Sequence, residues 1–385
     1  MKENLQQVIK KGASLMPKNL QAILLAGGKS IRFNTEKTKL TEKICGKEMI
    51  LYPLDLLQRM NIPTTMVVGF QKEKILDVLT KHNIKNVDIA VQEEQLGTGH
   101  AVVMSRDHWE KEHILIMNGD IPLMTAEVIQ KLYNKHIKTD ADISFATAHS
   151  LDETSDNYCR IVINDNKIRV IERRDEALDR DAQCCVSVGV YIVKKSFLQT
   201  HIDKLTKSSL TQEYYLPELI QIASNHNCKI ITTPIAFDLA RAVNTLAELW
   251  VVEHIKRSQL ISYWMNHGVR FAISLNVMID CDVILEPGVY IGSGAHLLGK
   301  TIVKKNANIG AFAYVKNSTI EENAKIKSHT VIINSTIGQD AIINSFTQVN
   351  YQHVDGTLKK LPKKTSPLFT GAIKDEIEMD NSSHL

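Results

Sequence analysis

The chain has 385 residues, more than one compact core can hold, and this length predicts two or three domains. Its 46 basic and 43 acidic residues leave a net charge of +3, which argues against nucleic acid or a membrane surface as a partner. None of the six cysteines forms a C-x-x-C pair, and no segment has the length of a membrane span or the core of a signal peptide, so we expect reduced thiols and a cytoplasmic protein.

The sequence of residues 1–20 predicts a polar helical leader, and apolar segments begin at about residue 21. Up to about residue 125, apolar strand-like segments alternate with segments whose apolar residues have helical spacing. This alternation predicts βαβ units and a parallel sheet with helices on both faces, and such sheets bind ligands at the carboxyl ends of their strands. The expected strands are 22–26, 66–69, 89–92 and 114–117, and the expected helices are 51–60, 74–82 and 99–109.

Residues 141–235 predict the second half of the same domain, with antiparallel strands added to the sheet. The first domain is therefore placed at 21–243, and a connecting helix at 244–268, where apolar residues have helical spacing up to Gly268. In the second half the expected strands are 143–148, 161–163, 186–193 and 230–233, and the expected helix is 214–223.

Aliphatic residues then recur every six positions, which is the signature of a parallel β-helix built from hexapeptide repeats. We place this β-helix at 269–350 and expect three or four coils of three hexads each. Residues 351–385 predict a polar, partly disordered tail. The regular positions are Ile279, Leu285, Ile291, Leu297, Val303, Ile309 and Val315, followed after a one-residue slip by Ile320, Ile326 and Ile332.

A glycine-containing loop follows the first predicted strand, in the stretch Leu24-Leu25-Ala26-Gly27-Gly28-Lys29-Ser30-Ile31-Arg32-Phe33. Glycines let the backbone approach a ligand closely, and bare N–H groups flanked by cations suit a phosphate chain. The alternative is an ordinary strand–turn–helix with solvated charges.

A second cluster, Gln92-Glu93-Glu94-Gln95-Leu96-Gly97-Thr98-Gly99-His100-Ala101, places two amides after a strand and a threonine where a helix should begin. A glutamine side chain has both the donor and the acceptor needed to read a base edge. Thr98 is expected to cap the helix. The alternative is a capped helix entry with surface glutamines.

Two further clusters are candidates for a cation site. Asp120, in Asn118-Gly119-Asp120, comes directly after an apolar strand, where a hard cation that bridges phosphates is often held. Asn244 leads into the connecting helix. The alternatives are that Asp120 caps the following helix and that Asn244 is simply the N-cap of its own.

Together these motifs resemble the nucleotide-diphospho-sugar pyrophosphorylases, and in particular the bacterial bifunctional family that joins an N-acetylglucosamine-1-phosphate uridylyltransferase to a glucosamine-1-phosphate acetyltransferase. The resemblance covers about residues 21–345 and includes Glu213-Tyr214-Tyr215 and the passage from Val243-Asn244 into hexapeptide repeats. It implies an α/β fold: a Rossmann-like nucleotidyltransferase domain with a mixed, mostly parallel sheet, followed by a short left-handed parallel β-helix.

The resemblance also implies roles for individual residues. Arg32, Lys39 and Asp120 would be catalytic, with Asp120 and Asn244 as ligands of Mg²⁺. The implied reaction joins UTP and N-acetylglucosamine 1-phosphate, with release of pyrophosphate. The residues implied to contact the two substrates are Leu25, Ala26, Gly27, Gly28, Gln92, Gln95, Gly97, Thr98, Asn118, Gly119, Cys159, Glu172, Ser187 and Asn244.

The chain departs from the family pattern at both ends of the implied site. The loop after Gly28 lacks the usual second glycine, Thr38 replaces a proline, and Asn118 replaces a tyrosine. At the sugar end, Cys159 replaces a glycine and Ser187 an asparagine. Another sugar 1-phosphate or nucleotide, or a regulatory subunit without turnover, therefore remains an alternative.

Two more expectations come from family likeness. The acetyl-transfer residues lie in later coils than this chain contains, so we expect no acetyl transfer and expect the β-helix to support self-association, such as a homotrimer. The segment from Leu25 to Ser30 also resembles the molybdenum-cofactor guanylyltransferases, which lack the Gln92–Ala101 stretch and the β-helix.

Overall fold

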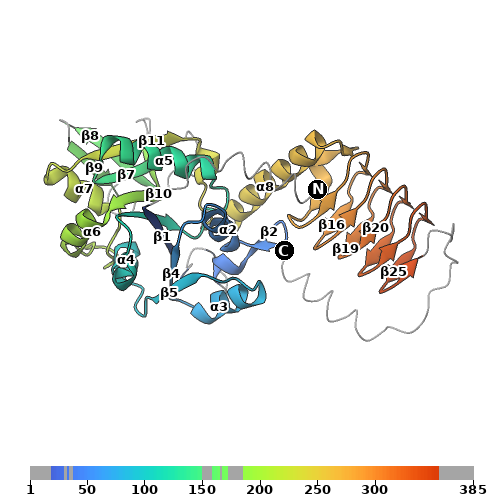
Figure 1. The fold of residues 1–385 in the computed structure, drawn as a ribbon, viewed down its shortest axis with the longest axis horizontal. Helices are drawn as coiled ribbons and strands as arrows, with labels where there is room; N and C mark the ends of the chain where they lie inside the picture. Colours follow the sequence, from blue (N-terminus) through green and yellow to red (C-terminus); the bar gives the residue numbers. More distant parts are fainter. Residues whose placement is uncertain are drawn as a thin grey trace. The chain divides into compact units, whose positions relative to one another are not determined.

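The computed structural model describes residues 19–29, 33, 38–149, 158–164, 167–171 and 185–354. The chain divides into two compact units, with the division between His254 and Ile255 (Figure 1). The predicted leader and tail lie outside the described residues, apart from a few positions at their inner ends. No helix in the described part of the chain is both long enough and apolar enough to cross a lipid bilayer.

The first unit is built on a nine-stranded sheet whose main path has the order β11-β7-β10-β6-β1-β4-β5. The pairs β1–β4, β1–β6, β4–β5 and β7–β11 are parallel, whereas β10 runs antiparallel to its neighbours β6, β7 and β8. The mixed, mostly parallel sheet that the family resemblance implied is confirmed. The strands are β1 Leu20–Ala26, β4 Thr64–Val68, β5 Val87–Val91, β6 His113–Asn118, β7 Ile143–His149, β8 Cys159–Asn164, β9 Lys167–Ile171, β10 Cys185–Lys194 and β11 Ile230–Ile235.

The helices of this unit pack apolar faces against the sheet. All seven residues of β1 are buried, as expected for a parallel strand covered on both faces. The helix expected at 214–223 begins only at Glu218, because Pro217 occupies its N-cap position, and α5 was not predicted. The elements are η2 Lys39–Thr41, β2 Lys43–Ile44, β3 Lys47–Glu48, α2 Leu51–Arg59, α3 Lys72–Lys81, α4 Thr98–Met104, η3 Arg106–His108, α5 Ala126–Thr139, α6 Lys195–His201, η5 Ile202–Lys204, α7 Glu218–Asn225 and η6 Phe237–Ala240, followed by α8 Leu246–Asn266, which crosses the unit boundary.

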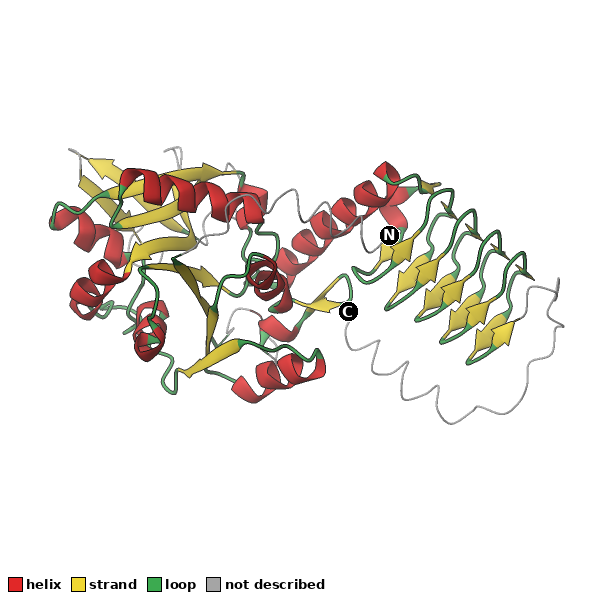
Figure 2. Cartoon of the chain, viewed as in Figure 1, coloured by secondary structure: helices red, strands yellow, loops and turns green. Residues whose placement is uncertain are grey.

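The second unit is the β-helix, in which three parallel sheets each contain five short strands (Figure 2). The aliphatic residues of the hexapeptide repeat point inward and form one continuous core, so the predicted left-handed parallel β-helix is confirmed. Its strands are β12 Arg270–Phe271, β13 Met278–Ile279, β14 Ile284–Leu285, β15 Tyr290–Ile291, β16 His296–Leu298, β17 Ile302–Val303, β18 Asn308–Ile309, β19 Tyr314–Lys316, β20 Thr319–Ile320, β21 Lys325–Ile326, β22 Val331–Ile333, β23 Thr336–Ile337, β24 Ile342–Ile343, β25 Gln348–Asn350 and β26 His353–Val354.

The expectation of three or four coils was wrong, because each face stacks five strands. The register explains the error. Leu285 pairs with Val303, 18 residues later, but Val303 pairs with Ile320 and Ile320 with Ile337, each 17 residues later. The one-residue slip seen once in the sequence thus recurs in every later coil, and it hides the continuation of the repeat.

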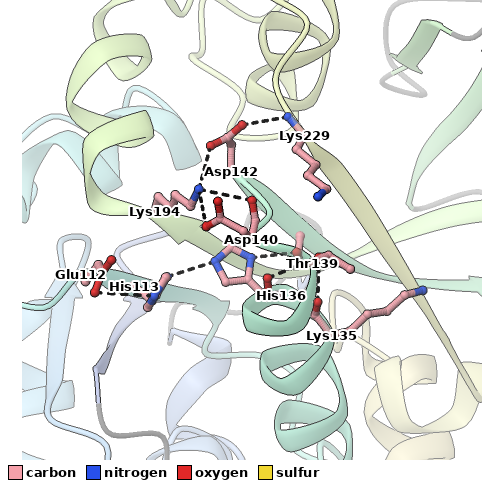
Figure 3. Close-up of polar contacts among 10 residues, drawn as sticks. Glu112, His113, Lys135, His136, Thr139, Asp140, Asp142, Lys194 and Lys229 are labelled. Carbon is pink, nitrogen blue, oxygen red and sulfur yellow. Dashed lines mark hydrogen bonds and ion pairs between the residues drawn. The ribbon is translucent and has the colours of Figure 1, made fainter.

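Two buried imidazoles form a hydrogen-bonded pair at the amino end of β6, the opposite end of that strand from Asn118 (Figure 3). His113 Nδ1 lies 3.1 Å from His136 Nε2, and His136 Nδ1 lies 2.8 Å from Ser144 Oγ. Burial, the neighbouring His113 and Lys194 lower the pKa of His136 to about 4, although Asp142 and Asp140 oppose the shift. The folded first unit therefore keeps this imidazole neutral.

This pair predicts acid sensitivity of the fold. The pKa of His136 is near 6.5 in the unfolded chain and about 4 in the folded protein, so between these pH values the unfolded chain binds more protons. The contribution of His136 to the free energy of unfolding is therefore fully present above pH 6.5 and is lost as the pH falls toward 4. We expect the free energy of unfolding to fall by about 2 kcal/mol from pH 7 to pH 5 through His136. Thermal melts of His136→Gln should show a shallower pH dependence, whereas the exposed control His267→Gln should follow the wild type; equal slopes for all three proteins would contradict this.

Candidate active site

The parallel strands β1, β4, β5 and β6 end at one edge of the first sheet, and the glycine loop, Gln92 and Asp120 follow the ends of β1, β5 and β6 there. The backbone ties these strand ends together. The Gly119 N–H donates to the Leu25 carbonyl at 2.9 Å, and the Phe70 N–H donates to the Gly27 carbonyl at 3.1 Å. The side chains that the sequence placed after separate strands thus lie on one rim, the usual ligand edge of such sheets.

A lysine bridge forms the centre of this rim. Lys39 Nζ donates to Asp120 Oδ2 at 2.6 Å and to Asn244 Oδ1 at 2.9 Å. The side chains of Lys39 and Asp120 are only 13% and 14% exposed. Asp120 Oδ1 is buried and has no hydrogen-bond partner among the described residues. One carboxylate and one amide from distant parts of the chain therefore converge on a single cation.

The position of Asn244 has a local cause. The Val243 N–H donates to the Asp120 carbonyl at 3.0 Å, which fixes the segment before α8 against the end of β6. Asn244 is not the N-cap, the alternative considered from the sequence. Instead, the Glu248 N–H donates to Thr245 Oγ1, and Glu248 Oε2 accepts the Asn244 N–H at 2.7 Å. Thr245 and Glu248 thus form a capping box in which the glutamate bonds to the residue before the cap, and the side-chain oxygen of Asn244 accepts from Lys39 instead of capping the helix.

The donor set suits a hard divalent cation. Carboxylate and amide oxygens are the protein ligands that Mg²⁺ accepts, and the buried Asp120 Oδ1 is an oxygen without a partner in the described structure. The described residues contain no cluster of three His, Cys, Asp or Glu side chains that would form a complete protein cage. A magnesium ion held here would therefore take its other oxygens from water or phosphate, as this ion usually does.

Gln92 links two loops of the rim. It is 3% exposed, its Nε2 donates to the Gly97 carbonyl at 3.0 Å and lies 3.1 Å from His100 Nδ1. Its Oε1 lies close to Gly27: a Cβ added to that glycine would be only 2.7 Å from this oxygen. His100, to which the sequence gave no role, thus orients an amide that was predicted to bind substrate.

Thr98 begins α4 but does not cap it, so the expected role was wrong. Its Oγ1 accepts the Leu216 N–H at 3.0 Å, and the Gly99 N–H donates to the Tyr214 carbonyl at 2.8 Å. Gly97 has φ +99°, and a Cβ there would lie 2.5 Å from the Tyr214 carbonyl oxygen. The 97–99 segment therefore packs directly against the Glu213-Tyr214-Tyr215 motif, and this close contact leaves no room for a side chain at Gly97.

Gln95 closes the turn before Gly97. Its Nε2 donates to the carbonyls of Gln92 and Glu93, both at 3.0 Å. The amide of Gln95 thus stabilises the conformation of this loop.

The two residues expected at the sugar end, Cys159 and Ser187, are direct cross-strand partners on β8 and β10. Ser187 is buried, and its Oγ lies 2.8 Å from the Tyr191 hydroxyl oxygen. The register of β10 shifts between these two residues, where Gly189 has φ +72°, and a Cβ on Gly189 would lie 2.4 Å from Asn118 Nδ2. The backbone of β10 at Gly189 therefore lies directly against the Asn118 side chain. Arg32 and Glu172 lie outside the described residues.

Tyr158 is a supporting residue that the sequence reasoning missed. Its hydroxyl accepts the Ala242 N–H at 2.7 Å and donates to the Ala240 carbonyl at 3.2 Å, so it clamps the segment that leads to Asn244. Burial is the main reason that its pKa lies well above the ordinary value of a tyrosine. Its only signal in the sequence was its place directly before Cys159.

Comparison with known proteins matches both units. Residues 22–173 match the MobA-like NTP transferase domain, and residues 276–362 match the GMPPB C-terminal domain. The Bifunctional protein GlmU of Exiguobacterium sibiricum is 30% identical over 305 residues, which span 78% of this chain and 67% of that protein. The chain belongs to the GlmU family. The GlmU of Limosilactobacillus reuteri is 32% identical over 306 residues, which span 78% of this chain and 66% of the relative.

The family resemblance drawn from the sequence motifs is therefore confirmed, although the chain spans only about two thirds of the length of these GlmU relatives. The MobA-like match also accounts for the second likeness, in the loop that begins at Leu25. The glycine loop and two residues of the lysine bridge, Lys39 and Asp120, lie in the part of the chain that matches the NTP transferase domain. The third, Asn244, lies beyond it.

Gly27 and Gly28, which are adjacent in the glycine loop, offer a matched test of the packing between this loop and Gln92. Gly27→Ala places a methyl group against the buried amide of Gln92, whereas a Cβ on Gly28 has no atom within 4 Å. We expect Gly27→Ala to lower the free energy of unfolding of the first unit by about 1–3 kcal/mol, and Gly28→Ala to change it by less than about 0.5 kcal/mol. Denaturant melts followed by tryptophan fluorescence measure both, and equal loss in the two variants would count against the packing described.

Proposed function

We propose that this GlmU-family chain is a Mg²⁺-dependent sugar-1-phosphate uridylyltransferase, which joins UTP and N-acetylglucosamine 1-phosphate to give UDP-N-acetylglucosamine and pyrophosphate. The observation that carries the proposal is the convergence of Lys39, Asp120 and Asn244 at the rim where the glycine loop begins. Membership of the GlmU family supports it, since the names of the relatives state a bifunctional protein and the matched domain is an NTP transferase.

The reaction requires little covalent chemistry from the protein. The phosphate oxygen of a sugar 1-phosphate is already anionic, so it can attack the α-phosphorus of UTP without a general base. The barrier is the approach of two polyanions, whose repulsion amounts to about 4 kcal/mol per charge pair at 4 Å and an effective dielectric constant of 20. Catalysis therefore depends on alignment and charge compensation.

The residues of the rim suit this task. Lys39 and Arg32 would neutralise the triphosphate, and the backbone of Leu25 through Gly28 would line it. Asp120 and Asn244 would hold Mg²⁺, which when bound supplies positive charge to the transferring phosphoryl group and the departing pyrophosphate. Gln92, Gly97 and Thr98, with Gln95 close by, would surround uracil and ribose, while Asn118 and Gly119 would reach the ribose from β6.

The sugar end leaves a second candidate substrate. Ser187 bonds to Tyr191, and a Cys159 side chain replaces the small residue expected beside it, so the sugar pocket differs from the family pattern. Another hexose 1-phosphate is therefore the alternative to N-acetylglucosamine 1-phosphate, with Glu172 as a further sugar contact. A regulatory subunit without turnover is disfavoured, because a protein without turnover has no need to keep a buried lysine bridged to an acid and an amide.

Three further expectations stay predictions. The aliphatic-cored β-helix would support a homotrimer, the protein would act in the cytoplasm, and it would not transfer acetyl groups to glucosamine 1-phosphate. Size measurement in solution tests the first of these directly.

Removal of the carboxylate tests the proposed reaction. Asp120→Asn keeps the shape of the side chain but removes the charge that faces Lys39, so we expect turnover with Mg²⁺ and UTP to fall about 100- to 1000-fold. Asp55→Asn, which breaks a lysine–aspartate pair elsewhere in the same unit, should keep wild-type turnover. Near-wild-type activity of a folded Asp120→Asn protein would contradict the proposal.

Substrate identity is tested by a panel of UTP, dTTP, GTP and CTP against several sugar 1-phosphates, scored by pyrophosphate release. We expect UTP with N-acetylglucosamine 1-phosphate to give the highest kcat/KM. A higher value for another pair would move the assignment to that pair without changing the reaction type.

A further inference from the structure

We propose that Lys39 is a resident cation of the nucleotide-free protein, which competes with the metal for Asp120 and Asn244, so that the site accepts its divalent cation together with the nucleoside triphosphate rather than before it. The inference rests on the proposed function and deepens it, because it names the metal–triphosphate complex as the species that the site binds.

The first argument is shared oxygens. Of the three side-chain oxygens available to a metal, Lys39 Nζ contacts two, Asp120 Oδ2 at 2.6 Å and Asn244 Oδ1 at 2.9 Å, and leaves Asp120 Oδ1. Both contacts have ordinary hydrogen-bond geometry, and a charged partner makes them strong. A dication cannot bind the carboxylate and the amide oxygen together while the ammonium remains between Asp120 Oδ2 and Asn244 Oδ1.

The second argument is charge balance. Within the described rim, Asp120 supplies one negative charge and Lys39 one positive charge. Glu248, the nearest further carboxylate on this segment, accepts the Asn244 N–H and the Thr245 hydroxyl of the α8 capping box. A dication that enters without nucleotide would meet an ammonium and a carboxylate that the ammonium already compensates, so its binding is disfavoured.

The third argument is that only the side chain of Lys39 has to move. Its backbone neighbours are fixed, because the Thr38 N–H donates to Gln71 Oε1 at 2.8 Å and the Ile50 N–H donates to the buried Leu40 carbonyl at 3.1 Å. The four-carbon stem of a lysine allows the ammonium to turn from Asp120 to the oxygens of a phosphate. A triphosphate supplies the negative charge that attracts both the ammonium and the metal.

The consequence is coupled binding. If the nucleotide removes Lys39 from the acid–amide pair, it raises the affinity for the metal, and the metal must raise the affinity for the nucleotide by the same factor. The order of binding then follows from this chain's own lysine rather than from the metal's preference for phosphate alone.

The test measures Mn²⁺ binding to the full-length, nucleotide-free protein by electron paramagnetic resonance. We expect Lys39→Met to bind Mn²⁺ at least tenfold more tightly than the wild type, since methionine keeps the length of the side chain without its charge. The matched control Lys47→Met removes another ion-paired lysine of the same unit, the partner of Asp55, and should bind Mn²⁺ like the wild type. Equal or weaker binding by folded Lys39→Met would overturn the inference.

A second measurement changes the carboxylate, and its first arm does not need a lysine variant. Asp120→Asn should leave Mn²⁺ binding to the nucleotide-free protein within about twofold of the wild type, because Lys39 already masks the carboxylate. In the Lys39→Met background the same change should remove the gain. Tight Mn²⁺ binding by the wild type that Asp120→Asn abolishes would overturn the inference even if the Lys39 variants do not fold.

Failure of the proposed function would be visible separately. Wild-type protein that forms no UDP-sugar from any pair in the substrate panel would refute the uridylyltransferase. A wild type that does so, with Mn²⁺ affinity insensitive to Lys39, would refute only the resident-cation role.

Discussion

The contact of Lys39 with Asp120 and Asn244 connects three parts of the chain that are far apart in sequence. Lys39 begins a short helix after the first strand, Asp120 follows β6, and Asn244 precedes α8. Most of the other features of the rim serve to bring these three side chains together. The bond from Val243 to Asp120 ties two of the segments together, Tyr158 bonds to the backbone just before Asn244, and the Thr245–Glu248 capping box fixes the start of α8 directly after it.

The rest of the candidate site is arranged by close backbone approach. Gly27 leaves room for the Gln92 amide, Gly97 lies against Tyr214, and Gly189 lies beneath Asn118. Each glycine admits a neighbour from another strand or loop, so the loops over the sheet edge are held by mutual packing.

The features that sequence reasoning predicted have strong periodicity or a charged side chain at a strand end. The alternation of strands and helices up to residue 125 and the hexad aliphatics of the β-helix are patterns of burial, and burial is what the sequence records most directly. Asp120 and Asn244 were selected as candidates because a carboxylate after an apolar strand and an amide before a long helix are visible without coordinates.

The features that were missed depend on contacts between distant residues. Helix α5 was overlooked between two clearer segments, and Thr98 was assigned to its own helix because its partner, Leu216, lies 118 residues away. Tyr158 and His100 act through atoms of remote loops, and no local pattern marks them. Similarly, the bond between Lys39 and its two partners follows from the tertiary fold alone.

The later coils of the β-helix repeat with a constant offset of 17 residues, so each is stacked on the one before it with every core position in line. Addition or removal of one whole turn in this region would therefore preserve the alignment of all three faces. A difference of one residue within a coil is also accepted, since the 18-residue and the 17-residue spacings both keep the aliphatic side chains in the interior. The length of this module can thus change by whole turns without altering the candidate active site, whose described residues lie in the other unit.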